Sequence, residues 1–106
     1  MFDMNSINKR YWDVTIRYDT KSGEKEIVLN VECPKLAVLR KITELTKDQD
    51  NLISNLSEAL SMAFSKNKQN KAISADFIED NFDIDDINNL LLSYFNWVKD
   101  VKQSPN

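Results

Sequence analysis

Residues 84–101 restrict the fold most strongly, because their apolar face is too wide for a helix that is covered on one side only. Placed at about 100° per residue, the apolar side chains fill a sector of roughly 160°, whereas an ordinary surface helix has an apolar stripe of about 100°. These side chains are Ile84, Ile87, Leu90, Leu91, Tyr94, Phe95, Trp97, Val98 and Val101. Leu92 lies outside even this sector. We therefore expect the rest of the chain to cover this helix on more than one side, and at least one of Leu92, Phe95 and Trp97 to stay substantially exposed in a single protomer.

Residues 11–33 alternate between apolar and polar side chains on either side of Gly23, the only glycine in the chain. Such alternation is typical of strands with one buried face, and glycine adopts without steric cost the positive φ that tight turns require. The segment therefore predicts an antiparallel β-hairpin. We expect Cys33, in the inward register, to be a small buried hydrophobe rather than a nucleophile. The expected inward face is Trp12, Val14, Ile16, Tyr18, Ile27, Leu29, Val31 and Cys33.

Two helices are predicted next, over residues 35–45 and 47–66. Pro34 ends the sheet and suits the first turn of a helix. Thr46 and Gln49 have the spacing of a capping box and indicate a new helix start, although an unbroken helix stays open because no glycine or proline intervenes. The expected inward residues are Leu36, Leu39, Ile42 and Leu45, then Leu52, Ile53, Leu56, Ala59, Leu60, Ala63 and Phe64, with the serines of the second helix facing away.

Two more helices are predicted over residues 74–80 and 84–101. Ser74 and Asp83 are the expected caps, and Asn81 is expected to end the shorter helix in the left-handed conformation. The predicted fold class is α+β, with an N-terminal antiparallel β-hairpin packed against a bundle of three to four helices. It forms a single domain over residues 11–102, between a flexible arm at residues 1–10 and a tail at residues 103–106.

Composition excludes several classes of function. The net charge is −3, and residues 72–106 hold two lysines against seven acidic residues, so a general nucleic-acid binder is not expected. No apolar run approaches the about 20 residues of a membrane span, and the first residues do not resemble a signal peptide. With a single cysteine, a cytoplasmic setting is expected. The short lysine cluster of Lys66, Lys68 and Lys71 is expected to be a solvated loop.

Catalytic and metal-binding patterns are missing from the sequence. There is no histidine and only one cysteine, so neither a Ser/His/Asp triad nor a zinc site of the usual ligands can be built. The acidic group between Asp76 and Asp86 suggests calcium, but an EF-hand loop starting at Asp83 would place Ile87 and Tyr94 at ligand positions. Helix capping explains these acids better. We expect no enzyme activity, no catalytic residue, no metal and no cofactor.

The last third of the chain carries a family resemblance. The segment DFIEDNFDIDDINNLLLSYFNWVKD, Asp76 to Asp100, has an acidic lead followed by an apolar closing helix with a late tryptophan. In this it resembles the tail assembly chaperones of long-tailed phages (siphophages) and prophages. The resemblance implies a non-catalytic factor in the bacterial host cytoplasm, absent from the mature virion. Such a factor holds the helical tape measure protein and recruits the major tail tube protein during tail assembly.

Two interpretations of the closing helix stay open. Its aromatic residues are either core or a partner interface, and a homo-oligomer would use the same surface. The candidate protein-binding residues are Leu92, Phe95, Trp97 and Phe82. The alternative function is a small regulatory protein-binding domain, antitoxin-like or anti-repressor-like, that would use the acidic face from Asp76 to Asp86. A DNA-binding protein would need a basic recognition helix, and the lysine cluster lies in a loop-like stretch.

Overall fold

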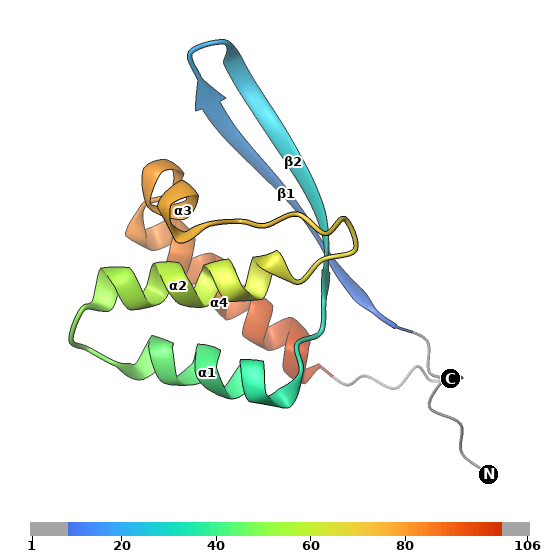
Figure 1. Ribbon diagram of the computed structural model, residues 1–106, viewed down its shortest axis with the longest axis vertical. Coiled ribbons are helices and arrows are strands. Elements are labelled where there is room, and N and C mark those ends of the chain that lie inside the picture. Colours follow the sequence, from blue (N-terminus) through green and yellow to red (C-terminus); the bar gives the residue numbers. More distant parts are fainter. Residues whose placement is uncertain (1–8, 101–106) are drawn as a thin grey trace.

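The computed structural model describes residues 9–100, which form a two-stranded hairpin followed by four helices (Figure 1). The strands are β1 (Tyr11–Thr20) and β2 (Gly23–Glu32), and the helices are α1 (Leu36–Lys47), α2 (Leu52–Ser65), α3 (Ala75–Asn81) and α4 (Ile84–Lys99). The predicted α+β class is confirmed. Most of the predicted arm, the tail at 103–106 and Val101 lie outside the described residues.

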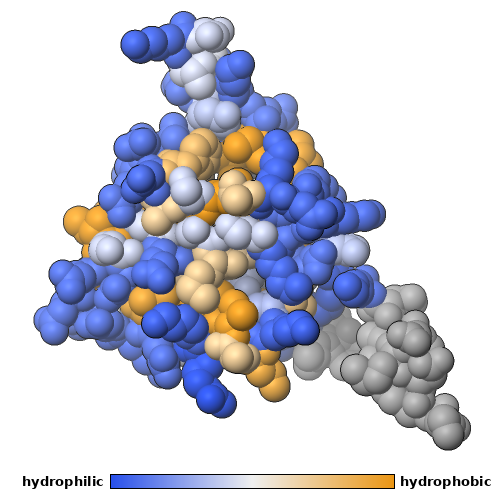
Figure 2. Space-filling view, in the orientation of Figure 1, coloured by the Kyte–Doolittle hydropathy of each residue, from blue (hydrophilic) through white to orange (hydrophobic). Residues whose placement is uncertain are grey.

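The hairpin is regular along its whole length, with register Trp12 opposite Val31 and Thr20 opposite Gly23. Gly23 has φ +112°, which an L side chain rarely adopts. The Thr20 hydroxyl accepts the Ser22 N–H and donates to the Gly23 carbonyl, which fixes the turn. The turn end of the hairpin projects beyond the helices (Figure 1), and polar residues dominate that end (Figure 2).

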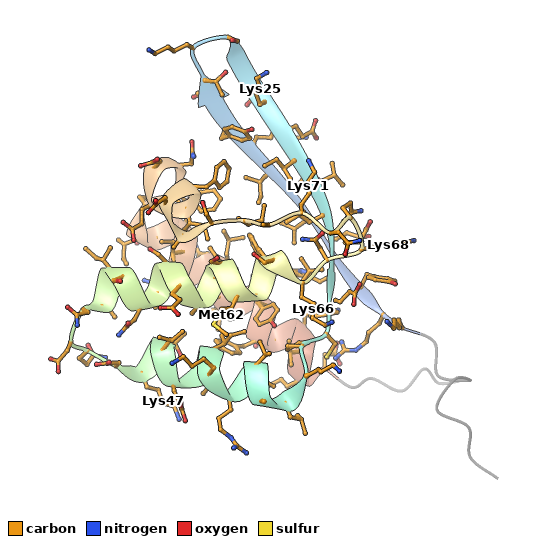
Figure 3. The ribbon with its side chains drawn as sticks, in the orientation of Figure 1. Lys25, Lys47, Met62, Lys66, Lys68 and Lys71 are labelled. Carbon is orange, nitrogen blue, oxygen red and sulfur yellow. The ribbon has the colours of Figure 1, made fainter. Side chains whose placement is uncertain are left out.

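The loop after α2 runs along the outer edge of β2 through its backbone, while Lys68 and Lys71 are exposed and Lys66 is partly exposed, as expected for a solvated lysine loop. The Glu32 N–H donates to the Lys66 carbonyl and the Lys68 N–H donates to the Asn30 carbonyl, each at 2.9 Å. Lys66 also forms an ion pair with Glu32 at 3.4 Å. Figure 3 shows Lys66 and Lys68 beside β2. The lysines are therefore spaced along a short bridge that covers one sheet edge.

Helix α2 begins later than predicted. Asn51, with φ 56°, occupies its N-cap position, and Asp48 accepts the Asp50 N–H in the connection. The capping box at Thr46 is wrong, because the Thr46 hydroxyl bonds back to the Thr43 carbonyl inside the end of α1. The two helices are separate and pack side by side (Figure 1).

The predicted caps of α3 and α4 are confirmed. Ser74 accepts the Phe77 N–H, and Asp83 forms a reciprocal capping box with Asp86. Asn81 does not adopt the left-handed conformation. It is the last residue of α3, and its side chain donates to the Phe77 carbonyl instead.

The core lies between the inner face of the hairpin and the helices. Its buried side chains are Val14, Ile16, Leu29, Val31, Ile42, Leu45, Leu56, Ala59, Leu60, Ala63, Phe64, Ile73, Ile78, Ile87, Leu91 and Tyr94. Several expectations fail at its margins. Cys33 lies beyond the end of β2 and is exposed. Leu36, at the first turn of α1, is 80% exposed. Ser57, expected to face water, is buried, and its hydroxyl donates to the Ile53 carbonyl one turn earlier.

Candidate protein-binding surface

Four exposed apolar side chains and one half-buried aromatic side chain, here called the apolar band, lie at the start of α2 and on α4. At the start of α2, Leu52 is 36% and Ile53 66% exposed, and on α4 Ile84 is 45% and Leu92 61% exposed. Phe95, half-buried, completes the band. Leu92 and Phe95 follow Ile84 by eight and eleven positions, which at about 100° per residue puts all three within about 80° of each other around α4.

A hollow of about 260 Å³ lies next to the band, where α2 meets the α3–α4 connection. Its lining combines exposed apolar groups with buried ones, so a ligand entering it would contact the core directly. Ile53 and Ile84 line it together, which places the α2 and α4 parts of the band side by side. Its other lining residues are Ser57, Glu79, Phe82, Asp83 and Ile87.

The surroundings of the hollow are acidic. Glu79 and Asp83 line it, and residues 72–98 contain no lysine or arginine. Asp83 and Asp86 satisfy the first turn of α4, since each accepts a backbone N–H of the other. Within residues 9–100, no three His, Cys, Asp or Glu side chains gather as a metal site would require. Two carboxylates, Glu79 and Asp83, therefore border the apolar side chains of this hollow.

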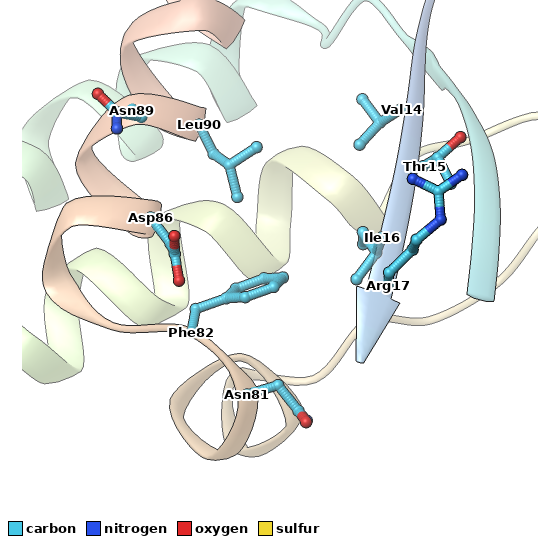
Figure 4. A pocket seen from close by; sticks show the side chains of 9 residues that line it. All are labelled: Val14, Thr15, Ile16, Arg17, Asn81, Phe82, Asp86, Asn89 and Leu90. Atoms are coloured by element: carbon cyan, nitrogen blue, oxygen red, sulfur yellow. The ribbon is translucent and has the colours of Figure 1, made fainter. Parts of the chain in front are cut away.

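A second hollow, here called the β1–α4 groove, lies on the other side of Phe82. It has a volume of about 330 Å³. In Figure 4 the Phe82 and Leu90 side chains point from one wall towards Val14 and Ile16 of β1. Four consecutive residues of β1, Val14 to Arg17, line the groove, so both the side chains and the edge of this strand border it.

Trp97 belongs to an aromatic cluster near the start of β1. Its ring is stacked at 6.3 Å on Trp12, whose ring centroid is also 5.9 Å from Tyr94 and 6.0 Å from Phe64. The Arg10 guanidinium lies 4.5 Å from the Trp97 ring centroid and donates to the carbonyls of Trp97 and Val98. This cluster joins the start of the hairpin to the end of α4.

Tyr94 carries the one buried side-chain polar atom without a hydrogen-bond partner in the described part of the chain. Burial is the main cause that raises the pKa of its phenol above the usual value of 10.0, and the nearby Cys33 thiol contributes to the same direction. The ring is in contact with Trp12, Phe95 and Trp97. Tyr94 thus serves the core as an aromatic ring rather than as a hydrogen-bonding group.

The structure separates the four candidate residues that the sequence indicated. Leu92 is exposed, as expected for at least one of the three candidates on α4, and Phe95 lies beside it with its ring 5.7 Å from Tyr94. Phe82 lines both hollows, and Trp97 lies in the aromatic cluster. Sequence reasoning missed Ile53 and Ile84, because helical periodicity assigned both to the core.

Comparison with known proteins found no matching family model, curated protein or solved structure. None of the described helices is long and apolar enough to cross a membrane.

Proposed function

We propose that this protein is a non-catalytic protein-binding factor that holds an amphipathic helix of a client protein on its apolar band. The exposed apolar side chains at Leu52, Ile53, Ile84 and Leu92 carry the proposal. Single exposed apolar residues are ordinary on protein surfaces, whereas exposed apolar residues grouped within a polar rim mark a site of association, and Ile53 and Ile84 line one hollow together.

The dimensions of the band suit a helix. Ile84 and Phe95 are eleven residues apart on α4, or about 16 Å at about 1.5 Å per residue. Three turns of a client helix cover that length, and such helices dock through anchors at i, i+3, i+4 and i+7. The hollow beside Ile53 and Ile84 would receive one large anchor side chain.

The acidic rim favours a client with basic residues beside its apolar face. Glu79 and Asp83 border the hollow, and Asp85 follows in the first turn of α4. Charge complementarity of this kind mainly raises the association rate and rejects acidic partners.

The resemblance of residues 76–100 to phage tail assembly chaperones identifies the client that we propose. This is the tape measure protein, a long helical protein that needs a binding partner until tail tube subunits enclose it. Recruitment of the major tail tube protein, in the cytoplasm of the bacterial host, is the second part of the proposal. An exposed band that accepts successive amphipathic turns of a long helix is consistent with such a role.

Co-expression with the tape measure protein encoded by the same phage or prophage tests the proposal. The wild-type chain should co-purify with it and keep it soluble, whereas the double variant Ile53→Asp/Leu92→Asp should lose both effects. The matched control Ser54→Asp/Asn96→Asp places the same charges on neighbouring exposed positions of α2 and α4 and should retain binding. Equal binding by both double variants, at unchanged circular dichroism, would contradict a role for the band.

A further inference from the structure

The outer edge of β1 is unpaired in the described part of the chain. β1 pairs with β2 alone, whereas the far edge of β2 is covered by the bridge at residues 66–68. An open edge strand is a template for another strand unless the protein blocks it. Over Asp13–Arg17 there is neither a proline nor a break in the register.

The hydrogen bonds of β2 reveal which groups of β1 face outward. The backbone of Asn30 and of Glu32 bonds to the 66–69 segment, so these residues point away from β1. Their partners Asp13 and Tyr11 therefore occupy non-hydrogen-bonded positions of the hairpin. Because the pattern alternates, Asp13, Thr15 and Arg17 all direct their N–H and C=O groups to the open edge.

Charge and side-chain pattern make this edge complementary to itself. We propose that a second copy of the chain pairs with it in antiparallel fashion, with Thr15 on the two-fold axis. Asp13 then lies opposite the partner's Arg17, and Val14 lies opposite the partner's Ile16. The outward-facing residues meet as hydrogen-bonded pairs in this register, which is the geometry that the backbone requires.

The new pairs extend polar rows that each hairpin already contains. Arg17 forms an ion pair with Glu26 at 3.5 Å, and Asp13 accepts a hydrogen bond from the Asn30 amide. In the dimer, a row of polar side chains would cross four strands on the outer face. It would run from Glu26 through Arg17 to the partner's Asp13 and the partner's Asn30. The adjoining β1–α4 groove, with Phe82 and Leu90 on its far wall, lies open beside the edge where the added strand enters.

Charge reversal gives a test that is independent of the proposed client. Sedimentation equilibrium of the full chain should show a monomer–dimer equilibrium for the wild type. Asp13→Arg places like charges opposite each other twice in a dimer, and Arg17→Asp does the same, so each should weaken dimerisation about tenfold or more. The double variant Asp13→Arg/Arg17→Asp should restore it.

Mixing the two single variants should give a heterodimer, because every facing pair is then of opposite charge. A wild-type chain that stays monomeric up to about 1 mM, well above the range of specific dimers, would overturn the inference. So would single variants that dimerise as strongly as the wild type, or a mixture that fails to associate. None of these results bears on capture of the tape measure protein.

Proline variants test the strand edge itself. Thr15→Pro removes an outward N–H at the two-fold axis and should abolish the dimer, while an edge strand tolerates proline at such a position. Val28 lies directly opposite Thr15 and faces the other sheet edge, so Val28→Pro is the matched control and should dimerise like the wild type. If both variants stay folded and dimerise equally, pairing along β1 is excluded.

Discussion

The buried hydroxyl of Tyr94 lowers the free energy of unfolding, and the core tolerates this loss. Its ring packs among Trp12, Phe95 and Trp97, while its hydroxyl has no hydrogen-bond partner among the described residues. A buried hydroxyl without a partner costs about 1–3 kcal/mol. Sequence periodicity placed Tyr94 inside but had no means of determining whether the hydroxyl would find an acceptor.

Replacing Tyr94 with phenylalanine should therefore raise the free energy of unfolding by about 1 kcal/mol at neutral pH. Urea unfolding measures the change, and Tyr18→Phe, at a half-buried tyrosine, should stay within about 0.5 kcal/mol of wild type.

The folded state raises the pKa of Tyr94 above 10.0, so it holds the phenol proton more tightly than the unfolded chain does. The effect of this proton on the free energy of unfolding is therefore constant below about pH 10, and stability is lost as the pH rises above about 10. Tyr94→Phe has no phenol to ionise, so it should lack this part of the stability loss at alkaline pH. A wild type and variant that lose stability in parallel would contradict the assignment.

Asn67 is the residue on which the bridge beside β2 depends. It is 3% exposed, and its amide donates to the carbonyls of Phe64 and Lys71 and accepts the Lys71 N–H. We predict that Asn67→Ala lowers the free energy of unfolding by about 2–3 kcal/mol, because it leaves buried backbone groups without partners. Thermal or urea unfolding measures the loss, with exposed Asn88→Ala as the control. Equal stability of the two variants would show that the Asn67 hydrogen bonds do not hold the loop.

Among the helices and strands, the sequence predicted the features that depend on residues close together in the chain. The alternation around Gly23 and the caps at Ser74 and Asp83 were found from sequence, since each depends on neighbours within a few residues. The bridge at residues 66–68 was missed, because it pairs with β2 more than thirty positions away. Leu36 and Ile53 were assigned to the core because periodicity identifies the apolar face of a helix but not where its cover ends.

The contribution of the α4 capping box to the stability of the protein should be measurable. Asp83→Ala removes the acceptor for the Asp86 N–H and should lower stability by about 1 kcal/mol. Asp85→Ala removes a neighbouring acid of the same first turn that is not part of the capping box, so it should cost less. Urea unfolding of both variants gives the comparison, and a larger loss for Asp85→Ala would exclude the capping role of Asp83.

At the level of the whole molecule, the two ends of α4 have different roles. Its last turn is held to the start of β1 through Arg10, Trp12 and Trp97. Its first half borders both hollows, one through Ile84 and Ile87 and the other through Asp86, Asn89 and Leu90. The sequence indicated that this helix has more apolar surface than one neighbour can cover. It could not indicate that the surplus continues onto α2 at Ile53, because that depends on how two distant segments pack.

Methyl NMR of the wild-type chain, titrated with a helical fragment of the proposed tape measure client, shows directly whether the client binds to the apolar band. We predict that the methyl signals of Ile53, Ile84 and Leu92 shift, since these side chains form the exposed part of the apolar band. Leu36 and Val28, 80% and 52% exposed and not part of the band, are internal controls, and their signals should not move. Binding that shifts the Leu36 or Val28 signals and leaves the band signals unchanged, or a fragment that produces no shift at all, would show that the band does not hold the client.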